Sequence, residues 1–220
     1  MSKIYLATTN PGKLREFQEA AQQSGVELES LPGLESFPPA IEDGLTFEEN
    51  ARIKAEHYSR FLSGELIAAE DSGLAVEQLN GAPGVYSARY ALLLGAQAPS
   101  PAAPLHGQAP GHTNSDDEEN NRALVSQLER LPAGKHAGKY VCVIALAREG
   151  ETIACFTGES PGELLTKPRG TGGFGYDPLF FFPSLDKTFA ELTLEQKRQY
   201  SHRGQAFRQL LDWYSRQPKL

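Results

Sequence analysis

A chain of 220 residues has room for one large domain or two small lobes with a substantial buried core. Its 40% hydrophobic and 22% charged residues are typical of a soluble globular protein, and its formal net charge of −7 argues against a nucleic-acid polymer as partner. The sequence contains no run of about 18 apolar residues and no basic-then-apolar leader. We therefore expect neither a membrane span nor a signal peptide, and a cytoplasmic location.

The first predicted element is a strand from Lys3 to Thr8, followed by a polar turn and a helix that begins near Pro11. A strand, a short loop and a helix N-terminus together present free backbone N–H groups and a positive dipole end to an anion. Lys13 would add a positive charge there. The same residues also fit an ordinary helix start, with Asn10 as the cap, Pro11 in the first turn and Lys13 exposed. This stretch alone favours neither interpretation.

A second helix is predicted after the acidic turn Glu42-Asp43-Gly44, because Thr46 and Glu49 form a capping box. Lys54 lies on a different face of this helix from its predicted buried stripe. If the start of the helix borders a binding site, Glu42 can join Asp71 around a cation and Lys54 can reach a phosphate. The alternative for Lys54 is a solvated surface lysine, which is the usual situation of this residue type.

The most informative stretch begins with a buried strand from Leu66 to Ala69, which we expect to end at a Ser72-Gly73 turn. Glu70 and Asp71 would then lie beyond the carboxyl end of a strand, where open α/β sheets gather their ligand sites. Because side chains alternate along a strand, one carboxylate should face the site and the other its wall. Adjacent carboxylates repel each other unless a cation or a shared proton intervenes, which suggests Mg²⁺; the alternative is a solvated acidic turn.

The next part of the chain is less regular. A turn from Gly81 to Gly84 leads into a segment that carries one arginine, Arg89. From about residue 92 to residue 113 the composition shifts to Ala, Pro and Gly, which cannot contribute much core. We expect a flexible insertion within a single domain that spans residues 1–220.

Two neighbouring strands, Tyr140 to Ala147 and Thr152 to Thr157, predict a hairpin that turns at Arg148-Glu149 or at Glu149-Gly150. Each strand carries one of the two cysteines, Cys142 and Cys155. The first turn would place them opposite one another and the second would separate them. We expect both to be reduced core thiols.

Two later segments contain candidate ligand-binding residues. The loop from Pro168 to Pro178 contains four glycines around Phe174 and Tyr176, which permits close approach to a flat ligand with aromatic stacking; the alternative is a flexible turn before the strand Leu179 to Phe182. Ser201 to Gly204 interrupts the C-terminal helical region. Its His-Arg pair can donate to a base carbonyl or a phosphate, or can form a surface ion pair.

Taken in chain order, these motifs resemble those of the inosine triphosphate pyrophosphatase family, from about residue 3 to about residue 214. The ordered set of motifs is more specific than any single motif. The motifs are Thr8-Thr9-Asn10-x-x-Lys13, Glu42, Glu70-Asp71-Ser72-Gly73-Leu74, Gly81-Ala82-Pro83-Gly84, Gly172-Gly173-Phe174-Gly175-Tyr176-Asp177-Pro178 and Ser201-His202-Arg203.

The resemblance implies a mixed α/β fold of two lobes around a long twisted β-sheet, with flanking helices and a central cleft. It also implies a homodimer, dependence on Mg²⁺, and hydrolysis of ITP, dITP, XTP or dXTP to the monophosphate and pyrophosphate. Two alternatives stay open at this point. One is a pyrophosphatase for modified pyrimidine nucleotides on a similar fold, and the other is a regulatory module that binds purine triphosphates without turnover.

The resemblance further assigns roles to individual residues. It gives the metal to Glu42 and Asp71, with Asp71 also accepting the proton of the attacking water. One departure is visible, because Glu70 stands where many members have Asp. The residues implied for substrate binding are Thr8, Thr9, Asn10, Pro11, Gly12, Lys13, Lys54 and Arg89 for the triphosphate, Ser72 as a substrate contact, and Phe174, Gly175, Tyr176, Asp177, Lys197, His202 and Arg203 for the base.

Overall fold

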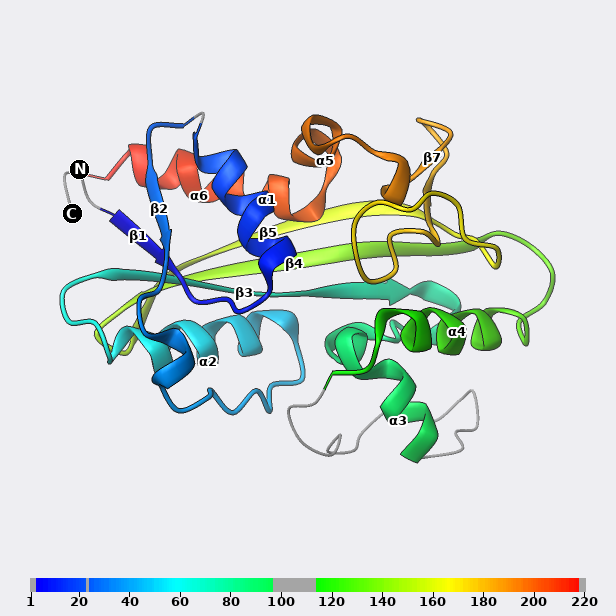
Figure 1. The fold of residues 1–220 in the computed structure, drawn as a ribbon, viewed down its shortest axis with the longest axis horizontal. Helices are drawn as coiled ribbons and strands as arrows, with labels where there is room; N and C mark the ends of the chain where they lie inside the picture. Colours follow the sequence, from blue (N-terminus) through cyan, green and yellow to red (C-terminus); the bar gives the residue numbers. More distant parts are fainter. Residues whose placement is uncertain (1–2, 23, 97–113, 218–220) are drawn as a thin grey trace. The chain divides into compact units, whose positions relative to one another are not determined.

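The computed structural model describes residues 3–22, 24–96 and 114–217. The strands are β1 Lys3–Leu6, β2 Glu27–Ser30, β3 Leu66–Val76, β4 His136–Arg148, β5 Glu151–Leu164, β6 Phe180–Phe182 and β7 Lys187–Thr188 (Figure 1). The α-helices are α1 Pro11–Gln22, α2 Phe47–Ser59, α3 Tyr90–Ala96, α4 Asp117–Leu128, α5 Leu194–Tyr200 and α6 His202–Ser215. None of the helices in these ranges is long and apolar enough to cross a membrane.

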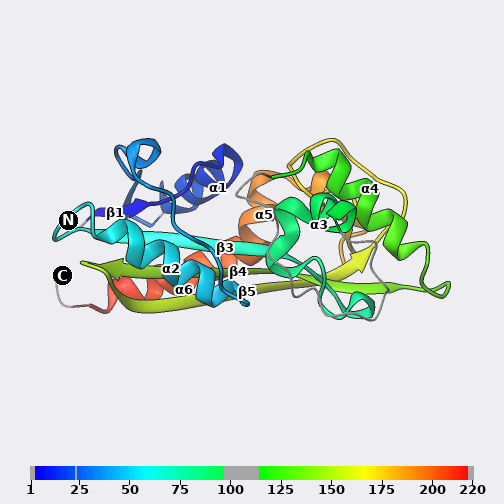
Figure 2. The ribbon, with the colours of Figure 1, turned by 90° about the horizontal axis from the view of Figure 1, so that it is seen from below.

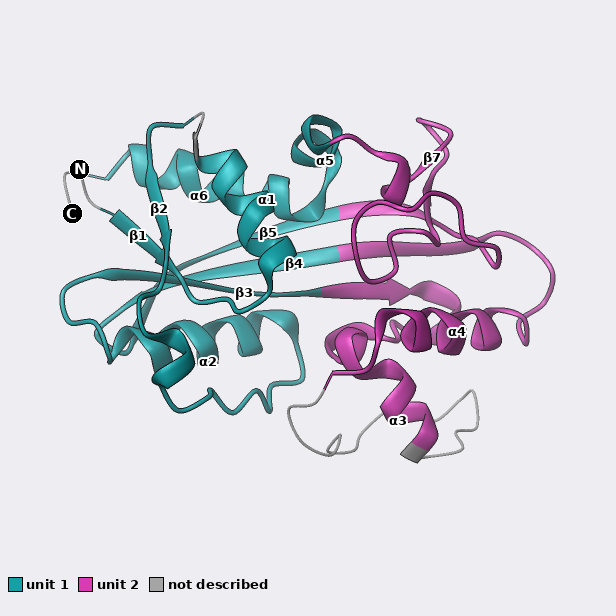
Figure 3. Cartoon of the chain, in the orientation of Figure 1, with its two compact units in different colours: residues 1–72, 141–159, 194–220 teal, residues 73–140, 160–193 magenta. Residues whose placement is uncertain are grey.

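The strands pair in the order β2-β1-β3-β4-β5-β6-β7 and form one mixed sheet. Strand β1 runs parallel to both β2 and β3, whereas β6 runs antiparallel to β5 and β7. The chain divides into two compact units, which are drawn in different colours in Figure 3. Unit 1 comprises residues 1–72, 141–159 and 194–220, and unit 2 comprises residues 73–140 and 160–193. The expectation of a mixed α/β fold with a long sheet and flanking helices is confirmed.

Unit 1 has a separate hydrophobic core on each face of its strands. One core joins Leu66 and Ala68 of β3 to Phe17 of α1 and Phe207 of α6. The other joins the alternate β3 residues, Ile67 and Ala69, to the α2 side. Helices α1 and α6 therefore cover one face of these strands and α2 covers the other (Figure 1). The alternation along β3 continues into its next two residues, so Glu70 is directed toward the α1 and α6 face and Asp71 toward the α2 face.

The predicted end of the central strand is wrong. Strand β3 does not stop at Ala69 but continues without a turn through Ser72 and Gly73 to Val76. Gly73 serves close packing instead of a turn, because a Cβ there would collide with the side chain of Ser87 and would lie 2.7 Å from the carbonyl oxygen of Gly84. A Ser-Gly pair in a sequence does not distinguish a turn from a strand that another segment approaches closely.

The hairpin between β4 and β5 turns at Glu149-Gly150, the second of the two positions left open. Both residues have positive φ, 52° and 85°, as a two-residue hairpin turn of this kind requires. Cys142 belongs to the core on the α1 and α6 face, while Cys155 packs against the core on the α2 face. Both are free thiols, as expected.

Unit 2 has a core rich in aromatic side chains, in which the rings of Tyr140, Phe180 and Phe189 lie with centroids 4.6 to 5.7 Å apart. Helices α3 and α4 lie side by side in this unit (Figures 1 and 2). Residues 92–96 of the expected flexible insertion belong to α3. The remainder of that insertion, residues 97–113, lies outside the described residues.

Candidate active site

The predicted catalytic carboxylate, Asp71, is buried, and each of its two oxygens contacts a side chain of helix α2. Its Oδ1 lies 3.2 Å from the Nζ of Lys54, and its Oδ2 accepts a hydrogen bond of 3.3 Å from the side-chain amide of Asn50. Leu6 of β1 pairs with Ala68 of β3, so Asp71 lies just past the carboxyl end of β1. Asp71 thus lies beyond the end of β1 but, contrary to the prediction, inside β3.

Lys54 joins the two carboxylates that were predicted to share a cation. Its Nζ lies 2.8 Å from Glu42 Oε2 and 3.2 Å from Asp71 Oδ1. Burial opposes the charged ammonium, but the attraction of Asp71, Glu42 and Glu70 is stronger and raises the pKa of Lys54 above its ordinary value. Lys54 is therefore a largely buried cation between two carboxylates, with a side chain 13% exposed, and the alternative of a solvated surface lysine is wrong.

On the other face of β3, Glu70 is paired with Lys13 of α1. The two side chains are 2.5 Å apart, and the Sγ of Cys142 lies 3.8 Å from the second oxygen of Glu70. Asn10 caps α1 by accepting hydrogen bonds from the backbone N–H groups of Gly12 and Lys13, at 2.9 and 3.0 Å. The helix start is thus capped as one interpretation predicted, while Lys13 points to a carboxylate and is not an exposed lysine.

The two adjacent carboxylates differ in proton affinity. Burial favours the neutral form of Glu70, but Lys13, Arg203 and Lys54 outweigh it and lower the pKa to about 2. At Asp71 burial dominates, and together with the negative charges of Glu70 and Glu42 it raises the pKa above the ordinary value against the pull of Lys54 and Lys13. Environments that push two acids apart in this way suit different roles, with Glu70 permanently charged and Asp71 able to accept a proton.

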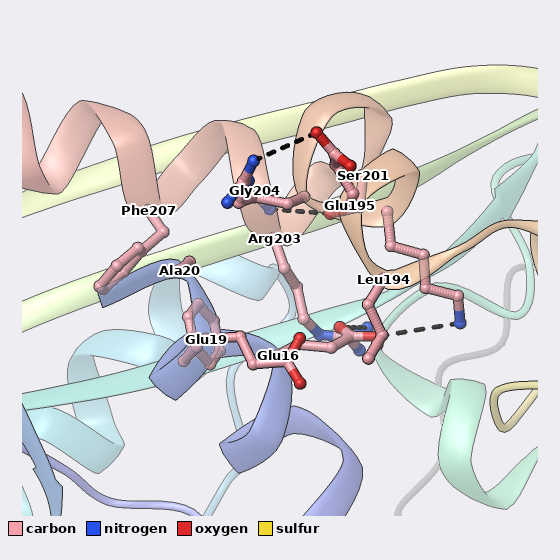
Figure 4. A pocket seen from close by; sticks show the side chains of 12 residues that line it. Glu16, Glu19, Ala20, Leu194, Glu195, Ser201, Arg203, Gly204 and Phe207 are labelled. Carbon is pink, nitrogen blue, oxygen red and sulfur yellow. Dashed lines mark hydrogen bonds and ion pairs between the residues drawn. The ribbon is translucent and has the colours of Figure 1, made fainter. Parts of the chain in front are cut away.

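A cavity of about 410 Å³ lies between α1, α5 and α6 in unit 1 (Figure 4). Glu16 and Arg203 meet in it, with Nη1 3.2 Å from Oε2, and Lys197 lies 3.8 Å from the other oxygen of Glu16. Arg203 also donates to the hydroxyl of Ser72, at 3.0 Å. Ser201 starts α6 as its cap by accepting from the N–H of Gly204, at 2.9 Å. The predicted residues Ser72, Lys197 and Arg203 therefore lie in one connected polar network.

His202 is fully buried beside this network. Burial, with the neighbouring positive charges of Arg203, Lys13 and Lys197, holds its pKa well below 6.5. A neutral imidazole in the folded protein cannot take up the proton that an unfolded chain binds near pH 6.5, so folding stability is present above that pH and falls as the pH drops below it.

We predict that replacing His202 with glutamine flattens this dependence. The wild type should lose up to about 1.4 kcal/mol of unfolding free energy per pH unit more than His202→Gln as the pH falls below about 6.5. Urea unfolding midpoints of both proteins between about pH 7.5 and pH 5.5 measure the difference. Two parallel curves would show that His202 does not control it.

Thr8, Thr9 and Pro11 lie in unit 1 beside Asn10, whose N–H donates to the hydroxyl of Thr8, at 3.2 Å. The other predicted residues belong to unit 2, where several have structural partners. The guanidinium of Arg89 lies 5.5 Å from the centre of the Tyr86 ring. Tyr176 donates its hydroxyl to the carbonyl of Ser87, at 2.8 Å, and Asp177 accepts from the backbone N–H of Phe174, at 3.3 Å. Gly175 donates its N–H to Asp117, at 2.7 Å. Their roles toward a substrate, like that of the central cleft, stay predictions.

Two residues of the site escaped the sequence reasoning. One is Asn50, whose contact with Asp71 the sequence patterns did not predict. Glu16 was not considered at all, although it lies one helical turn after Lys13 and holds both Lys197 and Arg203. The available signal was spacing, because residues three or four apart on a helix share a face.

The carboxylates of Glu42 and Asp71 fit a Mg²⁺ ion whose other ligands are waters and substrate phosphates. Among the residues the structure describes, no group of three or more His, Cys, Asp or Glu side chains lies close enough to hold a metal alone. Glu42 and Asp71 nevertheless offer two hard oxygen donors around one cationic atom, the Nζ of Lys54. Mg²⁺ is commonly held by one or two carboxylates with waters and substrate phosphates, so this pair provides the usual number of protein ligands.

A sequence model of the Ham1 family matches residues 4–213. The chain belongs to the Ham1 family. Among curated members, the dITP/XTP pyrophosphatase of Acidobacterium capsulatum is 48% identical over 208 residues, which cover 94% of this chain and 96% of that one. The dITP/XTP pyrophosphatase of Yersinia pseudotuberculosis is 42% identical over 216 residues, which cover 96% and 98%. The family resemblance of the sequence motifs is thereby confirmed.

Solved structures of Ham1 proteins share the fold. A HAM1 protein from Coxiella burnetii superimposes with a TM-score of 0.79 and 37% identity, covering 99% of this chain and 100% of that one. The Ham1 protein of Staphylococcus aureus gives a TM-score of 0.76 and 35% identity, with 97% and 98% coverage. The similarity covers nearly the full length of both chains, so the fold described above is the one that these Ham1 proteins share.

Proposed function

We propose that this protein is a Mg²⁺-dependent pyrophosphatase that hydrolyses noncanonical purine nucleoside triphosphates, namely ITP, dITP, XTP and dXTP, to the monophosphate and pyrophosphate. Family membership and relatives named dITP/XTP pyrophosphatase support the activity. The observation that carries the proposal is the half-buried cluster in which Lys54 lies between Glu42 and Asp71. It combines a proton acceptor, oxygen donors for a cation and a mobile positive charge for phosphate.

Cleavage between the α- and β-phosphates needs water aimed at the α-phosphorus, a proton acceptor for that water, and positive groups around the leaving pyrophosphate. Asp71 is the proton acceptor, since its pKa is raised toward neutral pH, whereas Glu70 stays ionised. When a triphosphate binds, the ammonium of Lys54 moves from Asp71 to a phosphate oxygen and leaves Oδ1 open to water. Lys13 supplies the second positive charge. Glu42 and Asp71 would hold Mg²⁺, which when bound neutralises the crowded phosphate oxygens.

Recognition of the base depends on hydrogen-bond donors. Hypoxanthine and xanthine carry an oxygen at C6, whereas adenine carries an amino group, so a donor such as Arg203 or Lys197 would face another donor if adenine were bound. Leaving buried polar groups without partners can discriminate by up to about 10⁴-fold. The cavity lined by these two residues is the part of the described structure that supports this assignment.

The experiment that tests the proposal is an assay of the purified protein with and without Mg²⁺ on dITP, XTP, ATP, GTP and dTTP, with identification of the products. Monophosphate and pyrophosphate from dITP and XTP, in preference to the others, are expected. Diphosphate and phosphate as products, or a preference for the pyrimidine nucleotide, would refute it. Nucleotide binding without turnover would favour the regulatory module instead.

We predict that Arg203→Ala narrows the preference for dITP over dATP. The variant should lower the ratio of the two kcat/KM values by about 10-fold or more, because it removes a buried guanidinium that can donate to a C6 oxygen but not to the C6 amino group of adenine. Arg208→Ala is the matched control, since Arg208 lies on the same helix and its side chain contacts the backbone carbonyls of Arg198 and Gln199. An unchanged ratio in Arg203→Ala would move base specificity to other residues.

Three further expectations belong to the same proposal. The protein is expected to act as a homodimer in the cytoplasm, and residues 1–220 are expected to function as one domain. The family match across residues 4–213 supports the last of these. Light scattering of the purified protein measures the first.

A further inference from the structure

Asn50 is a buried polar residue in this site with no role so far. Its side chain is 2% exposed, and it lies on α2 one turn before Lys54. The amide nitrogen donates to Asp71 Oδ2, at 3.3 Å, and the amide oxygen accepts from the backbone N–H of Gly44, at 2.9 Å. The short Asn50 side chain therefore links the loop that carries Glu42 directly to Asp71.

The orientation of the amide follows from its partners. A carboxylate can only accept a hydrogen bond, and a backbone N–H can only donate one, so the reversed amide would face repulsion at both ends. The loop is also shaped around this side chain. A Cβ on Gly44 would lie 2.7 Å from the oxygen of Asn50, which is too close for any larger residue to fit without displacement.

Asn50 and Lys54 hold the two oxygens of Asp71 from the same helix face, since residues four apart on a helix are neighbours. Their behaviour during the reaction must differ. Lys54 carries a charge on a long flexible stem and is attracted to the substrate phosphates, whereas Asn50 is neutral, short and buried. Asn50 can therefore keep Asp71 in place after Lys54 has left it.

We propose that Asn50 is a positioning residue that fixes the carboxylate of Asp71 toward the attacking water and keeps the Glu42 loop beside it. This inference rests on the proposed function. It acts through Asp71 and not through contact with the nucleotide, so its loss should lower kcat and leave KM nearly unchanged. Misplacement of a reacting group by about 1 Å can cost about 100-fold in rate.

The test compares three variants of the full chain with dITP and Mg²⁺. Asn50→Ala removes both hydrogen bonds, while Asn50→Asp keeps an acceptor for Gly44 but replaces the donor to Asp71 with a repelling carboxylate. Ser59→Ala is the matched control, because Ser59 is equally buried on the same helix and likewise accepts from a distant backbone N–H, that of Gly150, at 2.8 Å. Melting temperatures establish that each assay is run on folded protein.

We expect Asn50→Ala to lower kcat by about 10- to 100-fold with KM within about 3-fold of the wild type, and Asn50→Asp to lower kcat at least as much. Ser59→Ala should keep the wild-type kcat. If Asn50→Asp keeps the wild-type kcat while Asn50→Ala loses it, Asn50 acts only through the loop and its link to Asp71 is refuted. If Asn50→Ala matches Ser59→Ala, the whole inference fails.

Two safeguards keep the test decisive. Should Asn50→Asp fail to fold, the comparison of Asn50→Ala with Ser59→Ala in kcat and KM still separates positioning from structure. A wild-type protein that releases no pyrophosphate from dITP would refute the proposed function itself. Wild-type turnover with an unaffected Asn50→Ala variant would refute only the role of Asn50.

Discussion

Replacing Asp71 with asparagine is expected to abolish pyrophosphate release from dITP while binding of dITP stays measurable. Asparagine keeps the size of the side chain and an oxygen that can accept from Lys54, but it cannot take a proton from water. Loss of a general base costs typically about 10² to 10⁴ in rate, and the variant also loses one charged oxygen donor for Mg²⁺. We therefore expect kcat to fall by at least about 10³-fold.

Single-turnover product analysis measures the loss, and calorimetric titration with dITP measures the binding that remains. Asp212→Asn, on the exposed side of α6, is the matched control for the same chemical change and should behave as the wild type. An Asp71→Asn variant that turns over dITP at the wild-type rate would exclude Asp71 as the base. A variant that neither binds nor unfolds normally would show that Asp71 serves the fold more than the reaction.

Local sequence rules predicted the starts of α1 and α2, and a cap of the same kind starts α6. The capping box of Thr46 and Glu49 forms as expected, and Asn10 and Ser201 cap their helices through their own side chains. These contacts span at most three residues, so the sequence contains all the information needed. Phe207 and Leu210 of α6 are three positions apart and both lie in the core, as the helical spacing of apolar residues predicts.

The ion pairs and hydrogen bonds between charged residues of the site could not be predicted from local sequence. Lys54 and Asp71 are 17 positions apart, and Glu16 and Arg203 are 187 apart. A lysine on an amphipathic helix is normally solvated, and only the tertiary structure shows that Lys54 lies between two carboxylates. The strand that carries Asp71 was also predicted too short, because Glu, Asp, Ser and Gly are rare inside strands and the polar partners that stabilise them there come from α1, α2 and α6.

The alternation of side chains along a strand was predicted correctly, although the strand was predicted too short. It predicted that Glu70 and Asp71 face different surroundings, and they do: Glu70 contacts Lys13 of α1 and Asp71 contacts two residues of α2. Their proton affinities diverge for that reason. The side chains of the helix on each face therefore determine which carboxylate has the raised pKa.

Replacing Lys54 with methionine is expected to destabilise the protein by about 2–4 kcal/mol at neutral pH, because it leaves the buried carboxylate of Asp71 without its cation, while the partly exposed Glu42 loses a weaker ion pair. Methionine fills a similar volume, so the loss reports the charge rather than a cavity. In a chain of this size, that should lower the melting temperature by roughly 5 °C or more. Lys135→Met is the matched control, since its exposed pair with Glu163 should contribute less than about 1 kcal/mol.

Mg²⁺ should stabilise Lys54→Met far more than the wild type. With the ammonium gone, the two carboxylates are free to bind the ion, and a concentration about 100 times the dissociation constant would restore about 2.7 kcal/mol. The double variant Lys54→Met with Glu42→Gln should lose most of that rescue, because one of the two oxygen ligands then has no charge. Melting curves with and without MgCl₂ measure all three proteins, and an equal shift in each would exclude Glu42 and Asp71 as the ligand pair.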